Sequence, residues 1–178
     1  SQQMLYAKKS EPDGLNNNLV NCLFCDPNSG MWVGTYQGGV NFYSRGNTPF
    51  IDRFPVISQT DDAKIRYVKS VYQGKDGKLW IGTDYGLHRF TRNFQLEKTY
   101  SNSPEPGSLS VGGVTAIHSD KFNNLWVGTW GGGVNVMDRQ TEKFVKYSND
   151  VGRNTTDSTL TGDSNIRAFV EDSKGFLW

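Results

Sequence analysis

The sequence predicts an all-β fold made of short strands and tight turns. Aromatic side chains make up 13% of its 178 residues and glycines number 20, a mixture typical of many short strands joined by turns. No segment shows sustained helical periodicity, and a chain of this length can bury a sizeable core. The 19 basic and 18 acidic residues nearly cancel, so the charge indicates neither nucleic acid nor an anionic membrane as a partner of this segment.

An internal repeat organises the chain. The segments MWVGTYQGGVNFY, LWIGTDYGLHRF and LWVGTWGGGVNVM align with one another, and a fourth copy begins at GFLW. Their tryptophans recur at intervals of 48, 46 and 52 residues, at Trp32, Trp80, Trp126 and Trp178. A regular period of this length indicates a repeat architecture, and the elements within one repeat decide which.

Each repeat opens with a strand of about six residues that starts 12 residues before the tryptophan. These strands begin at Val20, Val68, Val114 and Ile166. They are apolar on both faces, which indicates a sheet packed on each side. A polar turn, the tryptophan strand, a glycine-rich turn and a third strand such as GVNVM follow. A fourth strand such as residues 144–147 completes an antiparallel meander of four strands, the architecture of a β-propeller blade.

We therefore expect a β-propeller fragment with three full blades and partial blades at both ends. The expected boundaries are 1–11 for the outer strand of a preceding blade, 12–63, 64–108 and 109–159 for the three blades, and 160–178 for the start of a fourth. Closing a ring takes at least four blades, or roughly 190 residues. We accordingly expect a homodimer in which two copies cover each other's apolar ends.

The pattern L-x-x-N-x-V-x-x-I-x-x-D-x-x-G-x-L-W-I-G-T resembles the two-component regulator propeller repeat. GLNNNLVNCLFCDPNSGMWVGT follows it nearly throughout, whereas the copy ending LWVGT lacks the asparagine and the glycine, and the copy ending LWIGT lacks the leading leucine. The resemblance implies a periplasmic sensor, part of an inner-membrane-anchored hybrid histidine kinase whose kinase and membrane-spanning parts lie outside this chain. It also implies a small ligand, an oligosaccharide, and no catalysis by this segment.

The turns between second and third strands are expected at one mouth of the propeller, together with the links between blades. Five residues of these turns are our candidates for ligand binding: Trp130, Asp84, Tyr36, Gln37 and Tyr85. Aromatic faces stack on sugar rings, and polar side chains hold hydroxyls. Trp130 and Asp84 differ at an equivalent repeat position, which favours function over architecture. The alternative is that all five pack blade against blade.

We expect no cofactor, metal ion or catalytic residue in this segment. His88 and His118 are isolated, and the glycines at 131–133 precede a strand instead of the helix that a phosphate site needs. The CLFC segment has strand composition, which favours a structural role for its two cysteines. Two other functions stay open: a scaffold for protein–protein interaction, or part of a propeller enzyme such as a polysaccharide lyase or quinoprotein.

Overall fold

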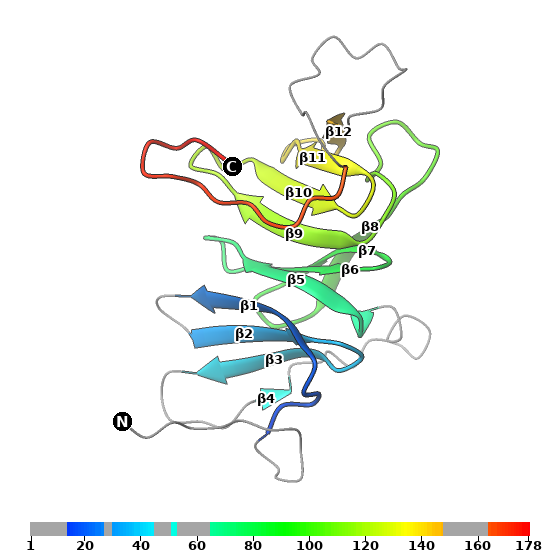
Figure 1. The fold of residues 1–178 in the computed structure, drawn as a ribbon. Coiled ribbons are helices and arrows are strands. Elements are labelled where there is room, and N and C mark those ends of the chain that lie inside the picture. Colours follow the sequence, from blue (N-terminus) through cyan, green and yellow to red (C-terminus); the bar gives the residue numbers. More distant parts are fainter. Residues whose placement is uncertain (1–13, 27–29, 45–50, 53–64, 148–163) are drawn as a thin grey trace.

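The computed structural model describes residues 14–26, 30–44, 51–52, 65–147 and 164–178. Within these ranges twelve strands form three four-stranded antiparallel sheets, each a meander with its strands in chain order (Figure 1). No helix in this part of the chain is long and apolar enough to cross a membrane. The outer strand expected in 1–11, the link expected at 55–64 and residues 148–163 of the link expected at 148–165 fall outside the described residues, and the blade boundaries stay a prediction.

The strands follow the order expected from the repeat. The first sheet contains β1 (Val20–Asp26), β2 (Gly30–Thr35), β3 (Gly39–Ser44) and β4 (Ile51–Asp52). The second contains β5 (Val68–Gln73), β6 (Leu79–Thr83), β7 (Gly86–Phe90) and β8 (Leu96–Tyr100). The third contains β9 (Val114–Ser119), β10 (Leu125–Thr129), β11 (Gly133–Met137) and β12 (Phe144–Tyr147). Beyond them, Val170 and Trp178 exchange backbone hydrogen bonds of 3.0 and 2.8 Å, which fold residues 164–178 back on themselves.

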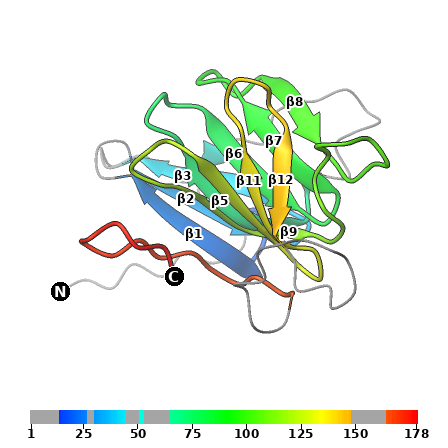
Figure 2. The same ribbon diagram turned by 90° about the horizontal axis from the view of Figure 1, so that it is seen from above.

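The three sheets lie face to face, with their first strands as neighbours. Figure 1 shows β1, β5 and β9 following one another, with the segment from residue 164 onward running beside β9. Figure 2, the view from above, shows the sheets overlying one another. Four equivalent segments, one from each repeat, therefore line up along one side of the molecule.

The alternation of side chains along each second strand fills both inter-sheet cores. In β6, Leu79 and Ile81 point into the core shared with the first sheet, which also contains Trp32. Trp80, between them in sequence, points into the core shared with the third sheet, next to Leu125. Because successive side chains of a strand point to opposite faces, one LWIGT segment packs against both neighbouring sheets.

The glycine of each LW(I/V)GT segment makes room for the next sheet. A Cβ atom added at Gly82 would lie 2.6 Å from both the Cγ1 atom and the carbonyl oxygen of Val114, the first residue of β9. Gly34 faces Val68 in the same way, and Gly128 faces Ile166. We call each of these glycine–valine or glycine–isoleucine contacts an inter-sheet joint. The bare backbone at the glycine is what lets two sheets approach this closely.

The threonine of the same segment closes the turn after the second strand. Thr129 Oγ1 donates a hydrogen bond of 3.2 Å to the carbonyl oxygen of Gly133, and Thr35 and Thr83 make the equivalent bonds. Gly131 and Gly133 have positive φ angles of 86° and 73°. These glycines turn the chain between two strands, as their sequence context predicted.

In the first and third sheets, a buried asparagine of the third strand ties the preceding link to its sheet. Asn135 Oδ1 accepts a 2.9 Å hydrogen bond from the backbone N–H of Ser110, and its amide donates at 2.8 Å to Ser110 Oγ. In the second sheet His88 takes the place of the asparagine. Its two ring nitrogens lie 3.0 Å from Thr83 Oγ1 and 3.1 Å from Thr99 Oγ1. His88 is 2% exposed, so its role is structural.

Candidate functional site

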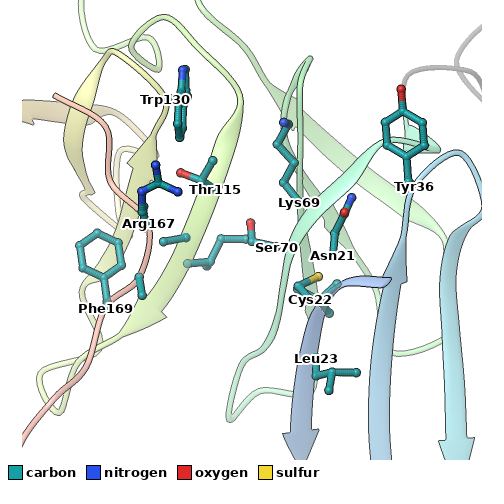
Figure 3. Close-up of a pocket in the computed structure, with 14 residues that line it drawn as sticks. Asn21, Cys22, Leu23, Tyr36, Lys69, Ser70, Thr115, Trp130, Arg167 and Phe169 are labelled. Atoms are coloured by element: carbon teal, nitrogen blue, oxygen red, sulfur yellow. The ribbon is translucent and has the colours of Figure 1, made fainter. Parts of the chain in front are cut away.

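A pocket of about 630 Å³ runs along the aligned first strands (Figure 3). Its wall consists of the same three consecutive positions from each of the four repeats, and two aromatic residues from the glycine-rich turns complete it. The repeat positions are Asn21–Leu23, Lys69–Val71, Thr115–Ile117 and Arg167–Phe169, and the aromatic residues are Tyr36 and Trp130. The pocket therefore follows from the repeat, because equivalent residues of the four repeats line the same cavity.

The two ends of the pocket differ in polarity. Figure 3 shows the first position of each triplet at the end nearest Tyr36 and Trp130, and Leu23 and Phe169 at the other end. We call the polar end the pocket mouth; it comprises Asn21, Lys69, Thr115, Arg167, Tyr36 and Trp130. A polar rim with flat aromatic side chains above an apolar interior is the usual make-up of a small-molecule site.

Two residues of the pocket mouth hold neighbouring sheets together. Asn21 Nδ2 donates a 2.7 Å hydrogen bond to the carbonyl oxygen of Val68, and Thr115 Oγ1 donates to that of Ile166. Both bonds connect one first strand with the first residue of the next. The side chains of Asn21 and Thr115 are therefore part of the architecture as well as of the pocket wall.

Lys69 occupies the equivalent position in β5 but does not make this bond. The neighbouring Ser70 makes it instead, donating from Oγ to the carbonyl oxygen of Val114 at 3.0 Å. The Lys69 ammonium group pairs with Asp84, with Nζ 3.1 Å from Oδ1, and both side chains are partly exposed. An exposed pair of this kind contributes at most about 1 kcal/mol to stability, so it leaves the lysine available to another anion.

Arg167 lies over the face of Trp130, with its guanidinium carbon 5.0 Å from the ring centroid. Within the described residues, no carboxylate lies within ion-pair distance of this guanidinium group. Trp130 itself is 48% exposed, which is unusual for a tryptophan. The cation and the indole ring therefore form one exposed unit at the pocket mouth.

The five residues predicted from sequence fall into two places. Trp130 and Tyr36 border the pocket, and Asp84 reaches it through Lys69. Gln37 and Tyr85 lie outside the pocket lining, around Tyr67. Gln37 Nε2 is 3.3 Å from the Tyr67 hydroxyl, and the ring centroids of Tyr67 and Tyr85 are 6.4 Å apart.

Sequence reasoning missed four residues of the pocket mouth, because it considered the turns and links only. These residues are Asn21, Lys69, Thr115 and Arg167. The sequence did contain a signal for them. The first residue of each first strand is always Val or Ile, whereas the second residue is Asn, Lys, Thr or Arg. A variable polar position inside an otherwise apolar strand indicates a side chain that faces a cavity.

The described residues offer little for metal or nucleophilic chemistry at this pocket. No group of three His, Cys, Asp or Glu side chains in this part of the chain is arranged to hold a metal ion. Burial raises the pKa of the Cys22 thiol, which borders the pocket, to about 12. This thiol is therefore protonated near neutral pH and is a poor nucleophile.

The two component regulator propeller family model matches residues 14–37, 64–85 and 108–131. Three segments of the chain are therefore two-component regulator propeller repeats. Each match covers the link, the first two strands and the start of the glycine-rich turn, and the three matches contain every residue of the pocket mouth except Arg167. No curated protein sequence matches the chain.

Solved structures share this propeller fold. The extracellular domain of BT3049 from B. thetaiotaomicron, described as a hybrid two-component system, is 26% identical with a TM-score of 0.72, and the match covers 93% of this chain and 20% of that one. The extracellular domain of BT4673 from the same organism, also described as a hybrid two-component system, is 21% identical with a TM-score of 0.74, covering 98% and 23%. PorZ, a surface component of the type-IX secretion system of Porphyromonas gingivalis, is 19% identical with a TM-score of 0.59, covering 92% and 24%.

This propeller chain spans about a fifth to a quarter of the length of those proteins. The likenesses below 25% identity show the fold alone. Together with the repeat match they confirm the predicted all-β propeller made of four-stranded antiparallel meanders.

Proposed function

We propose that this chain is the signal-input propeller of an extracytoplasmic sensor, and that it binds an oligosaccharide at the pocket mouth to control a histidine kinase located outside this segment. The observation that carries the proposal is the pocket itself, in which four repeats present equivalent residues beneath two exposed aromatic rings. The similar structures that are extracellular domains of two-component systems support the sensor role. We also propose that the propeller lies in the periplasm, anchored to the inner membrane by other parts of the protein, and the same likeness supports an extracytoplasmic location.

The chemistry of the pocket mouth suits a sugar. Its volume of about 630 Å³ lies within the usual range of ligand pockets, roughly 300–1,000 Å³. Trp130 and Tyr36, 48% and 41% exposed, offer flat faces to the C–H surfaces of a pyranose ring. Lys69 supplies a donor for hydroxyl groups.

Signalling requires that the ligand bind one arrangement of the sensor more tightly than another, because only differential affinity shifts a conformational equilibrium. We propose a homodimer as the unit that changes arrangement. Apolar side chains exposed on the third sheet and the segment after it offer an interface: Val145, Tyr147, Phe176 and Trp178. Light scattering of the natural full-length protein should give a dimer, and a monomer at every concentration would contradict this part of the proposal.

Binding is tested by isothermal titration calorimetry of the natural full-length protein against a panel of defined neutral and acidic oligosaccharides. We expect at least one member to bind, and Trp130→Ala to weaken it roughly tenfold, the loss of about 1.4 kcal/mol of contact energy. Phe122→Ala is the matched control, because Phe122 is an exposed aromatic residue on a turn that takes no part in the pocket. A panel without any binding member refutes the proposal.

A protein-interaction scaffold is the second candidate, and the surface around the pocket mouth favours it. Leu19, Tyr85 and Val111 are large apolar residues, each more than half exposed, in the links and turns. PorZ shows that this fold also occurs in a secretion-system component. Failure of all oligosaccharides, combined with loss of a partner protein on Leu19→Asp and Val111→Asp, would establish this candidate.

A further inference from the structure

The pocket has a charge that sugar binding alone does not require. Among the residues that the structure describes, its lining contains two cationic side chains, Lys69 and Arg167, and no carboxylate. They come from two segments on either side of β9, and Figure 3 shows both at the pocket mouth. A cleft lined by charges of one sign concentrates ligands of the opposite sign.

The architecture does not explain the charge at Lys69. Asn21 and Thr115, at the same repeat position, bond to the carbonyl oxygen that begins the next first strand. In β5 that bond is made by Ser70, so the inter-sheet joint is complete without the lysine. The side chain of Lys69 is thereby free to face the pocket.

Arg167 is arranged to bind an anion. Its guanidinium group stacks on Trp130 with 5.0 Å between the guanidinium carbon and the ring centroid. A stacked guanidinium group still presents the N–H donors along its edge, and their geometry matches the two oxygens of a carboxylate or sulfate.

We propose that the ligand of this pocket is an acidic oligosaccharide, whose carboxylate or sulfate group is held by Lys69 and Arg167 while a sugar ring packs on Trp130. The proposal rests on the proposed sensor function and names its ligand class. Asp84 has a defined part in it, because its carboxylate pairs with the Lys69 ammonium group. A bound anion must displace this carboxylate, so Asp84 discriminates against weakly charged ligands.

The experiment compares charged oligosaccharides with neutral versions of the same sugars. The probes are oligogalacturonate with its carboxyl-reduced counterpart, and a chondroitin sulfate oligosaccharide with its desulfated, carboxyl-reduced counterpart, each titrated into the natural full-length protein. We expect an acidic member to bind at least tenfold more tightly than its neutral counterpart, with an affinity that falls as salt is raised. A third chondroitin probe, desulfated with its carboxylates retained, tells carboxylate recognition from sulfate recognition.

Three variants assign the effect to residues. Lys69→Gln and Arg167→Gln should each weaken the acidic probe about tenfold and a neutral probe by much less, whereas Asp84→Asn should strengthen the acidic probe several-fold. Lys75→Gln is the matched control, because it removes the same charge from an exposed residue outside the pocket. Thermal unfolding of every variant shows whether the fold is retained.

The outcomes separate this inference from the function on which it rests. Equal binding of acidic and neutral members would overturn the acidic-ligand proposal while the sensor proposal stands. Absence of binding throughout both pairs and the wider panel would overturn both. Weakening by Asp84→Asn as large as that by Lys69→Gln would also overturn it, because it would show that the ion pair organises the pocket instead of competing with the ligand.

Discussion

The inter-sheet joint at Gly82 gives a prediction that the structure allows us to work out in detail. In Gly82→Ala the new Cβ atom would lie 2.6 Å from two atoms of Val114, one of them the backbone carbonyl oxygen, and would also meet Ser70 Oγ. The backbone atom can move away only if the second and third sheets separate locally. Overpacking of this kind costs about 1–3 kcal/mol, and the displaced hydroxyl group loses its 3.0 Å bond to Val114, worth about 1 kcal/mol.

The alanine also lowers the conformational entropy of the unfolded chain, which stabilises the folded state by about 0.5 kcal/mol. We therefore expect Gly82→Ala to lower the free energy of unfolding by about 1.5–3.5 kcal/mol. Urea unfolding followed by tryptophan fluorescence measures this directly. Gly131→Ala is the control, because a Cβ atom there meets nothing within 4 Å and the change costs only the strain of a φ angle of 86°, about 1 kcal/mol.

A double-mutant cycle with Val114→Ala tests whether the loss arises at the joint. Removing the Cγ1 atom of Val114 relieves one of the two contacts, so the double variant should be more stable than the sum of the single effects predicts. A Gly82→Ala variant within about 0.5 kcal/mol of the parent would refute the reasoning. Strict additivity would locate the damage elsewhere.

Two further predictions concern titratable groups. Hydrogen bonds from Lys98 and Arg89 lower the pKa of Glu142 to about 2, so its contribution is present above its ordinary pKa of about 4.5 and is lost as the pH falls toward 2. Glu142→Gln should therefore cost about 1–2 kcal/mol at pH 7, allowing for solvent screening, and almost nothing near pH 2 in pH-dependent urea unfolding. Because burial raises the pKa of Cys22 to about 12, iodoacetamide at pH 8 should modify exposed Cys25 first, and mass spectrometry showing Cys22 modified at an equal rate would contradict this.

The fold was largely predictable because equivalent residues of the repeats pack in the same way. Leu79, Trp80 and Gly82 have equivalents in the first and third sheets, and each set packs in the same way. Residues at these positions recur at a regular interval, so the sequence of this one chain is enough to identify them. The four-stranded meander followed from that period and from the turn residues.

The pocket was only partly predictable, because it depends on which repeats deviate. Lys69 becomes available only because Ser70 has taken over a hydrogen bond, a substitution between neighbouring residues that no periodic pattern displays. Likewise, Glu142 pairs with Arg89 and Lys98 across two sheets, and their separation in sequence gives no sign of contact. Contacts between unlike repeats depend on the spatial register of the sheets.

The inter-sheet joint has a consequence for how such a chain can change over generations. The second strand of each sheet carries a glycine. The space beside this glycine is filled by the first residue of the next repeat's first strand, which is Val68, Val114 or Ile166. A unit copied or deleted from one glycine to the next would meet the same kind of partner on both sides. Lengthening or shortening the array in this way creates no unfamiliar contact, so the number of blades can drift while the local packing stays the same.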